Sequence, residues 1–555
     1  MEEQEKNKRN FSGIKKFMNK FGFYIGILVI IAIAVIVVSS DNRVVFKGSV
    51  KYESPVYYVH NNMLFLKEHG NEAILISRNL LKEWSISEAN TVLVSVQITP
   101  DQTRMFFLEN INFKQSTYFG DLYVYSDGKK ELIGENAILE YVVSDDYDTV
   151  LYVSVSFTEE GKSYDLYKYN KESGTEHIDS NVDFICFTLS GNGNVAVYHK
   201  DYSYVNNTTS MYVHQDGESI LVADDAHLHG KHNPSGTFRN NWPIINRDGT
   251  RILYVARPEA NEMLDAYIYE SGSTRIIGQS ITQIYADEPV QTVLMIENAS
   301  IEKKSGDMVR MDLSTGNKET VAKNVWGLTD IYTARMMDST FIQRNIYFKN
   351  YLDMVNAADI YYMMDGQEIL LGSKVAVNKV QYSQNYMNFT TMEYYSEDSG
   401  GTIIHVSFQE NGEYVKFTGN DDTKEVRVTN DGRHKAYVSG GTLFLLDEDN
   451  KKSMIEISDV FNYEFMEDGD KLVYFKRREL TGDIKVQFLY GQKNNEVIAQ
   501  DVTSAWDFRE NGYIAFLAFY DFSTDAGTMV LTDARGNYEI IAEKVNAHLI
   551  HSFIY

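Results

Sequence analysis

The chain has 555 residues, with 39 Tyr and 29 Phe but only 6 Pro, and its formal net charge at pH 7 is −26. This length is sufficient for a large core or for more than one domain. A chain this acidic is expected to repel nucleic acid and anionic lipid headgroups, so no nucleic-acid partner is predicted. Cys186 is the only cysteine, which excludes an internal disulfide scaffold, and its apolar neighbours predict a buried side chain.

A basic tail and a long apolar run form the beginning of the chain. Residues 1–20 carry a net charge of +3, and residues 21–38 contain no charged side chain. An apolar helix of about 18 to 20 residues nearly crosses a hydrocarbon core of roughly 30 Å. The pattern predicts a cytoplasmic tail (1–20), a transmembrane helix (21–39) and an exported domain (41–555), as in a single-pass type II protein of the cell membrane. The alternative is a cleaved signal peptide, although no Ala-x-Ala site follows the run.

A short pattern recurs along the exported part. An apolar run beginning with Asp-x-Tyr leads into a Gly-containing turn and a second apolar run, as in a β-hairpin. Four copies begin with Asp-x-Tyr, at Asp121, Asp165, Asp265 and Asp359. Looser copies begin at Asn62, Ser210, Asp307, Thr402, Thr442, Asp483 and Thr528, and the eleven starts are 40 to 59 residues apart. A period of this size without helical patterning is typical of β-propeller blades.

Each repeat divides into four predicted strands. The turn between the first two strands recurs, for example, as Asp248-Gly-Thr250 and Asp431-Gly-Arg433. The sequence therefore predicts an all-β fold of about eleven four-stranded units. Because one propeller usually has four to eight blades, two propellers are predicted, over residues 41–324 and 325–555.

The order of an Asp-Gly turn, an apolar strand, a spacer, Asp-x-Tyr-x-Tyr and a Gly turn resembles TolB-like β-propeller repeats. Asp121-Leu-Tyr-Val-Tyr125 and Asp265-Ala-Tyr-Ile-Tyr269 are well-formed copies. The resemblance covers most of residues 55–545. It implies a propeller fold and does not specify an activity.

The two ends of the exported part complement each other. Residues 55–76 predict three strands of a unit that lacks its innermost strand, and residues 547–555 predict a single inner strand. Completion of the first unit by the last strand would remove two exposed sheet edges. The alternative is that residues 44–50 supply the missing inner strand.

A polar, histidine-rich insertion over residues 224–242 interrupts the repeats. Imidazole and carboxylate groups suit a divalent metal such as zinc, so a site formed by His227, His229 and His232 with Asp224 or Asp225 is one interpretation. The alternative is a solvated loop, and no cofactor is predicted. Because loops carry function more often than strands, the ligand-binding candidates are Arg239, Asn241 and Trp242 in the same insertion.

Other polar clusters have structural interpretations. Residues 145–148 and 447–450 are rich in Asp and fall at predicted turns, where Asp is favoured, and neither has the ligand spacing of an EF-type calcium loop. Trp326 and Trp506 precede predicted inner strands, so both are expected to pack between units.

The sequence favours binding over catalysis. It contains no Gly-x-Ser-x-Gly, Walker A or His-Glu-x-x-His motif. The prediction is a membrane-anchored extracytoplasmic module that binds, or acts as a scaffold for, an envelope protein, a peptide or a glycan. The alternative is a glycan hydrolase or lyase with a site at the propeller axis, where two carboxylates about 5–10 Å apart would indicate glycoside chemistry.

Overall fold

The computed structural model describes most of the chain after residue 55. The described residues are 48–49, 56–60, 62–82, 96–99, 103–159, 161–184, 186–203, 205–206, 208–227, 243–257, 263–300, 302, 305–328, 336–337, 345–383, 387–409, 412–466, 470–478, 481–489, 496–502, 506–508, 513–521, 523, 526–533, 535 and 537–546. In these ranges the regular elements are β-strands, apart from the short 3-10 helices η2 (Asp353–Val355) and η3 (Val377–Lys379).

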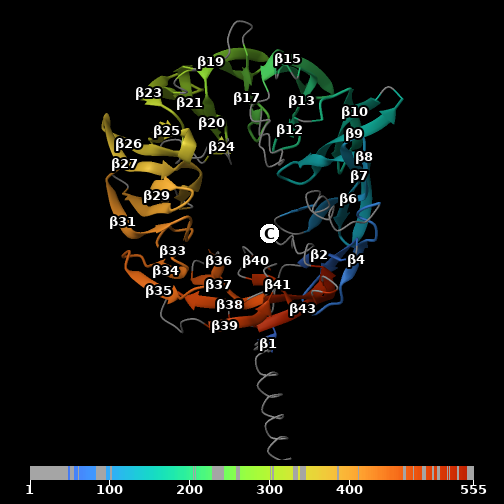
Figure 1. Cartoon of the computed structure of the whole chain (residues 1–555). Coiled ribbons are helices and arrows are strands. Elements are labelled where there is room, and N and C mark those ends of the chain that lie inside the picture. Colours follow the sequence, from blue (N-terminus) through green and yellow to red (C-terminus); the bar gives the residue numbers. More distant parts are fainter. Residues whose placement is uncertain are drawn as a thin grey trace, which may run out of the picture.

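The strands form one ring of predominantly antiparallel sheets (Figure 1). Within the described residues, strand pairing gives nine sheets, of which the seven-stranded and the eight-stranded sheet each contain two repeat units. The nine sheets therefore correspond to eleven units, most of them four-stranded, which confirms the predicted all-β architecture of repeated units.

The first five units occupy the blue-to-green part of the ring. The first unit has the described strands β2 (Val56–His60), β3 (Met63–Lys67) and β4 (Ile74–Ser77). The next two units share the seven strands β5 (Gln97–Ile98), β6 (Arg104–Lys114), β7 (Thr117–Ser126), β8 (Lys129–Val143), β9 (Thr149–Thr158), β10 (Gly161–Asn170) and β11 (Gly174–Ser180). The fourth and fifth units share β12 (Phe187–Leu189), β13 (Ala196–Ser203), β14 (Thr208–Gln215), β15 (Glu218–His227), β16 (Ile244–Ile245), β17 (Arg251–Ala256), β18 (Leu264–Glu270) and β19 (Ser273–Ile281).

The other six units complete the ring. The sixth and seventh contain β20 (Gln283–Asp287), β21 (Thr292–Ser300), β22 (Ser305–Asp312), β23 (Lys318–Val325), β24 (Met336–Met337), β25 (Ile346–Leu352), β26 (Ala357–Met364) and β27 (Gln367–Ala376). The eighth and ninth contain β28 (Gln381–Tyr382), β29 (Asn388–Ser396), β30 (Gly400–Phe408), β31 (Tyr414–Thr423), β32 (Val426–Val428), β33 (Lys435–Ser439), β34 (Thr442–Leu446) and β35 (Lys452–Glu456). The last two contain β36 (Val460–Phe465), β37 (Lys471–Arg478), β38 (Thr481–Phe488), β39 (Glu496–Val502), β40 (Trp506–Phe508), β41 (Tyr513–Asp521), β42 (Ala526–Asp533) and β43 (Asn537–Asn546).

The recurring hairpin pattern, with its close and looser copies, marks the same strand in each unit. Its copies run into the strands next to the outermost ones, namely β3, β7, β10, β14, β18, β22, β26, β30, β34, β38 and β42. An aromatic ring of this strand stacks on one from the preceding strand, as in the pairs Tyr58–Phe65, Tyr152–Tyr167, Tyr198–Tyr212 and Tyr254–Tyr267, with centroid separations of 5.2 to 5.5 Å. These cross-strand pairs give many of the tyrosines a structural role.

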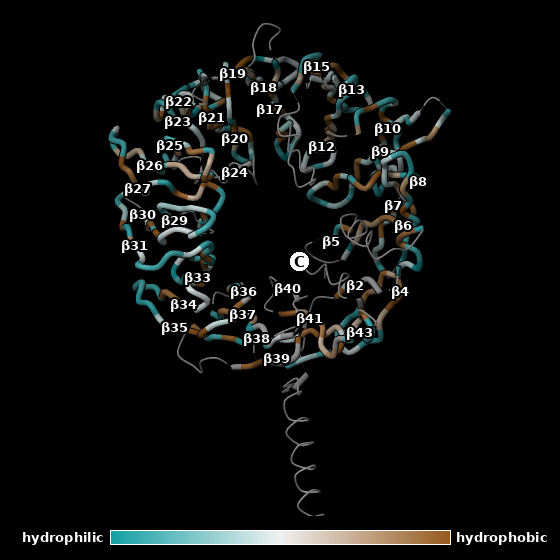
Figure 2. Tube along the Cα trace, viewed as in Figure 1, coloured by the Kyte–Doolittle hydropathy of each residue, from teal (hydrophilic) through white to brown (hydrophobic). Residues whose placement is uncertain are grey.

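The apolar core is distributed around the whole ring, as the hydropathy colouring in Figure 2 shows. Its clusters lie between neighbouring units. Val150 and Tyr152 of β9, for example, pack in one cluster with Phe107 of β6 and Leu122 of β7. Each unit therefore buries apolar side chains against the units beside it.

The ring closes where the first unit meets the last. Val56 and Tyr58 of β2 share an apolar cluster with Leu517 of β41 and Leu531 of β42. The Glu539 carboxylate of β43 adds polar contacts, with its Oε1 atom 3.5 Å from Lys67 Nζ and its Oε2 atom 2.8 Å from His69 Nδ1.

The number of repeats predicts two propellers, whereas Figure 1 shows one ring. The predicted boundary between residues 324 and 325 falls inside continuous packing, because Tyr285 of β20 and Leu294 of β21 share a cluster with Tyr347 of β25. The division into residues 41–324 and 325–555 is therefore corrected. Repeat spacing identifies the units, but the angle between neighbouring units sets the size of the ring, and spacing carries no information about that angle.

The N-terminal strand pairs with the end of the chain. Gly48 and Ser49 form β1, which runs parallel to Asn537 and Tyr538 at the outer edge of β43. These residues are therefore not part of an inner strand of the first unit, which corrects the alternative proposed for residues 44–50. The predicted inner strand at residues 547–555 lies outside the described residues and stays a prediction.

In the part of the chain that the structure describes, no helix has the length and apolar character needed to cross a membrane. The predicted tail (1–20) and the predicted transmembrane helix (21–39) both lie outside that part.

Deletion of residues 548–555 from the full-length protein is expected to lower the Tm by at least about 3 °C, because loss of an inner strand would leave the inner edge of β2 unpaired. Deletion of residues 2–9 from the basic tail serves as the control and should leave the Tm unchanged. An unchanged Tm in both variants, measured by differential scanning calorimetry, would refute closure by the last strand.

The variants Gly249→Ala and Gly272→Ala distinguish backbone strain from overpacking at two glycines of the fifth unit. Both glycines have a positive φ, of 78° and 76°, but a Cβ at Gly249 would lie 2.5 Å from Val195 Cγ2, whereas a Cβ at Gly272 would meet nothing within 4 Å. Backbone strain should cost about 1 kcal/mol in each variant, and overpacking should add about 1–3 kcal/mol in Gly249→Ala. Equal losses in chemical denaturation would contradict this interpretation.

Candidate functional site

The turns between the first two strands of many units share one hydrogen-bonded design. A buried side-chain oxygen at the start of the turn accepts a hydrogen bond from the backbone N–H five residues later, as in the pairs Thr99–Arg104, Ser144–Thr149, Ser190–Val195, Asn246–Arg251, Asp287–Thr292, Ser383–Asn388 and Thr429–His434. Such local bonds fix the turn conformation. Because these turns all connect the first strand to the second, they lie on one face of the ring, called the turn face below.

Neighbouring turns on this face are also hydrogen-bonded to each other. The contacts run from Asp145 N to Gly191 O (2.8 Å), from Asn192 N to Arg247 O (2.9 Å) and from Asn246 Nδ2 to Pro289 O (3.5 Å). Four successive units are thereby connected, so their turns form a preorganised surface.

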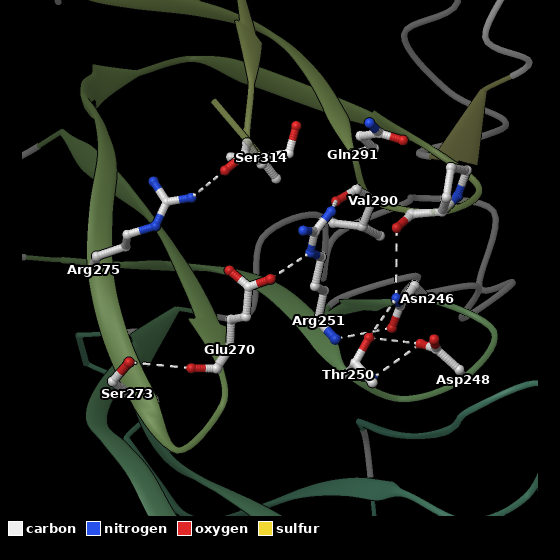
Figure 3. A network of polar contacts seen from close by, with 12 residues as sticks. Asn246, Asp248, Thr250, Arg251, Glu270, Ser273, Arg275, Val290, Gln291 and Ser314 are labelled. Atoms are coloured by element: carbon white, nitrogen blue, oxygen red, sulfur yellow. Dashed lines mark hydrogen bonds and ion pairs between the residues drawn. The ribbon is translucent and has the colours of Figure 1, made fainter. Parts of the chain in front are cut away.

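An open cleft of about 620 Å³ lies on this surface, at the turns of the fourth, fifth and sixth units. Its lining is polar, and Figure 3 shows the hydrogen-bonded network on its fifth-unit side. The lining residues are Asn192, Asn246, Arg247, Asp248, Thr250, Arg251, Glu270 and Pro289.

Arg251, the first residue of β17, is held firmly in the cleft. Its Nε atom lies 2.7 Å from Glu270 Oε1, and its Nη1 atom donates to Val290 O at 3.2 Å (Figure 3). The Arg251 backbone N–H donates to Asn246 Oδ1 at 2.9 Å. These contacts join the fifth unit to the sixth and leave Arg251 little freedom.

Asp248 is a fixed negative charge beside Arg247. Its Oδ1 atom accepts hydrogen bonds from the Thr250 hydroxyl at 2.7 Å and from the Thr250 N–H at 3.2 Å. These two bonds hold the pKa of Asp248 below its ordinary value, so the carboxylate is ionised at neutral pH.

Arg247 reaches across a whole unit. Its Nε atom lies 3.4 Å from Asp145 Oδ2, so the pair joins the fifth unit to the third over the turn of the fourth. Gly191 of that turn makes the crossing possible, because a Cβ there would lie 2.2 Å from Asp145 Oδ2 and 2.7 Å from Arg247 Cγ. The exposed fractions of the two side chains are 68% for Arg247 and 54% for Asp145.

The predicted metal-binding residues are only partly described. His227, at the end of β15, is buried, and its Nε2 atom accepts a hydrogen bond from Arg257 Nη2 at 3.3 Å. Burial and, next, the Arg257 charge lower the pKa of His227 to about 4. Asp224 and Asp225 lie on the same strand, whereas His229 and His232 lie outside the described residues. Among the described residues no group of three metal-ligating side chains occurs, and the metal site stays a prediction.

The predicted ligand-binding residues Arg239, Asn241 and Trp242 also lie outside the described residues. The insertion that contains them joins β15 to β16, so it connects the two units between which part of the cleft is formed. The structure therefore does not test these candidates.

Three predictions about structural residues are confirmed. Cys186 is buried, Trp326 packs against an apolar cluster that Phe348 of the seventh unit shares with Phe389 of the eighth, and Asp447 accepts hydrogen bonds from backbone N–H groups of its own turn. The side chain of Trp506 lies outside the described part.

The cleft itself was not apparent from the sequence pattern. The pattern identifies Asp248-Gly-Thr250 as a turn, but Asn192, Glu270 and Pro289 belong to other segments and meet it only in the folded ring. The available signal was that similar turns recur at equivalent places, because equivalent turns of neighbouring units must lie side by side.

No family model matches the sequence, and no curated protein matches it. Solved structures with a similar fold include TolB from Acinetobacter baumannii, with 13% identity over 72% of this chain and 81% of that chain and a TM-score of 0.22. The β-propeller domain of the trilobed protease from Pyrococcus furiosus has 15% identity over 60% and 98%, with a TM-score of 0.27. Oligogalacturonate lyase from Vibrio parahaemolyticus has 9% identity over 62% and 87%, with a TM-score of 0.26. These similarities concern the fold alone.

Buried histidines elsewhere in the ring are neutral hydrogen-bonding groups. The His199 Nδ1 atom lies 2.8 Å from the carbonyl oxygen of Cys186 and donates to it, and burial lowers the pKa of His199 from 6.5 to about 4. His405 is similar, since burial and then the charge of Lys435 lower its pKa to about 3. Both imidazoles are therefore poor bases at neutral pH and stabilise the fold in their neutral form.

The histidine pKa values predict that the protein loses stability in mild acid. Unfolded His199 binds a proton below about pH 6.5 and folded His199 only below about pH 4, so the unfolded state binds more protons between these values. The contribution of neutral His199 to the free energy of unfolding is complete above pH 6.5. This contribution falls by about 1.4 kcal/mol per pH unit as the pH decreases toward 4. Glu140, whose pKa burial raises to about 7, acts in the opposite direction.

Comparison with His199→Asn isolates this histidine from the opposing carboxylate. The asparagine amide retains a donor toward Cys186 O but does not titrate. Between pH 6.5 and 4.5 the free energy of unfolding of the variant should therefore fall less steeply than that of the natural protein. Identical pH dependence of the two proteins in urea titrations would show that His199 does not have the predicted pKa.

Proposed function

We propose that this protein is a membrane-anchored extracytoplasmic module that binds, or acts as a scaffold for, a partner in the cell envelope through the turn face of its ring. The observation that carries the proposal is the polar cleft of about 620 Å³ on this face. Rigid turns from three neighbouring units line the cleft. The entropic cost of ordering such a surface when a ligand binds is therefore small.

The state of the charged residues in the cleft supports recognition more than acid–base catalysis. A general acid or base needs a pKa near the working pH and access to the reacting atom. The pKa of Asp248 is lowered, and Arg251 is engaged by Glu270 and by Val290 O. Fixed charges of this kind suit the positioning of a ligand.

The anchoring part of the proposal rests on the sequence. Residues 1–20 carry a net charge of +3 and precede an uncharged run from residue 21 to residue 38. A basic flank on the cytoplasmic side would place the ring outside the membrane. An envelope protein, a peptide or a glycan would then be within reach of the turn face.

Site-specific photo-crosslinking in intact cells tests the proposal. A photoreactive amino acid at position 247, in the cleft, should give a discrete crosslinked adduct. The same amino acid at position 454 on the outer strand β35, where Met454 is 59% exposed, should give none.

A parallel screen of the purified full-length protein for turnover of envelope glycans tests the catalytic alternative. Turnover of a glycan, together with the absence of any adduct from position 247, would overturn the proposed binding role. An adduct from position 247 without turnover is the expected result.

A further inference from the structure

The cleft has balanced local charges in a strongly acidic protein. Its lining contains two arginines and two carboxylates, Arg247 and Arg251 against Asp248 and Glu270. Asp145 adds a further carboxylate beside Arg247, and the whole chain carries a net charge of −26. The field of the domain therefore favours the approach of a cationic ligand.

The two arginines of the cleft differ in how firmly they are held. Arg251 is half-buried, pairs with Glu270 at 2.7 Å and donates to Val290 O, so it belongs to the wall of the cleft. Arg247 is mostly exposed, and its Nε atom forms an ion pair with Asp145 at 3.4 Å. Exposed ion pairs of this kind contribute little to stability, so the Arg247 side chain can leave Asp145 at low cost.

The Arg247–Asp145 pair also shows what this part of the surface accommodates. Gly191 leaves the space above the turn of the fourth unit open, and a guanidinium reaches Asp145 through that space. Asp248 holds its charge nearby, since hydrogen bonds from Thr250 keep its carboxylate ionised. A cationic side chain from a ligand would find the same carboxylates.

We propose that the cleft binds a basic peptide segment, with a lysine or arginine of that segment replacing the guanidinium of Arg247 beside Asp145 and attracted in addition by Asp248. The inference rests on the proposed function and names the chemistry of its ligand. A peptide fits better than a glycan, because none of the described lining residues is aromatic and a sugar ring would have no stacking surface.

Binding of a defined probe to the purified full-length protein tests the inference. The probe is a fluorescein-labelled Gly-Ser decapeptide with two arginines, and its partner peptide has glutamine in place of both arginines. In fluorescence anisotropy the arginine peptide should bind, and the glutamine peptide should bind at least about tenfold more weakly.

Matched variants localise the binding. The double variant Asp145→Asn/Asp248→Asn keeps side-chain oxygens for the turn hydrogen bonds and should weaken binding about tenfold. Asp431→Asn is the control, because Asp431 occupies the equivalent turn of the ninth unit, where its Oδ1 atom accepts from the Thr429 hydroxyl and from Arg433 N. The control should change the affinity by less than about twofold. Arg247→Gln removes the competing guanidinium and should strengthen binding.

Three results would overturn the inference while leaving the proposed binding role intact. Equal weakening by Asp431→Asn would show that net charge alone attracts the peptide. Weakening by Arg247→Gln, with preferential binding of a glutamate version of the probe, would indicate a carboxylate ligand. Failure of the arginine peptide to bind, while position 247 still crosslinks in cells, would show that the partner is not a basic segment. Circular dichroism of each variant checks that the fold is retained.

Discussion

At several junctions of the ring, a phenol crosses from one unit to a carboxylate of the preceding unit. The Tyr198 hydroxyl of β13 donates to Asp179 of β11 at 2.7 Å, and Lys200 pairs with the same carboxylate at 3.0 Å. Tyr437 and Tyr474 make equivalent bonds to Asp421 and Glu456 of the preceding units. Burial alone would raise the pKa of Asp179, but the hydrogen bonds from the tyrosine and the lysine outweigh it and the pKa is lowered. The carboxylate therefore stays charged, and a hydrogen bond to a charged group is stronger than one between neutral groups.

The turn face lies at the ends of the strands that these links and the aromatic stacks hold together. Stacked tyrosines fix the second strand of a unit against the third, and the phenol then fixes the second strand against the unit before it. The backbone hydrogen bonds from Asp145 N to Gly191 O and from Asn192 N to Arg247 O show that the first turns of neighbouring units meet in a similar register. This register allows Asn192 N to reach Arg247 O and allows Arg247 to lie over Gly191. Within the described residues, the cleft is formed by ordinary turns at regular spacing, without an insertion or a special loop.

The parts of the structure that could be predicted are those set by local pattern. Asp121-Leu-Tyr-Val-Tyr125 alternates along one strand, so its strand, its hairpin and its recurrence follow from the sequence. The burial of Cys186 and the packing of Trp326 follow from their apolar or strand-adjacent positions. The single ring does not follow, because the angle between units arises from side-chain packing such as that of Tyr285 with Tyr347. The cleft does not follow either, since Asn192, Asp248 and Pro289 are separated by tens of residues.

The closure of the ring also determines how the cleft is presented. The described N-terminal strand β1 joins the outer edge of β43, on the side of the ring opposite β17, as Figure 1 shows. The cleft is formed at the turns around β13, β17 and β21, so it lies about half a ring away from the point where the N-terminal segment attaches. If that segment holds the protein at the membrane, as proposed, the attachment and the binding surface are separated by the diameter of a rigid ring. A partner could then occupy the cleft without contacting the anchored edge, and its specificity would depend on the charges of the turn face alone.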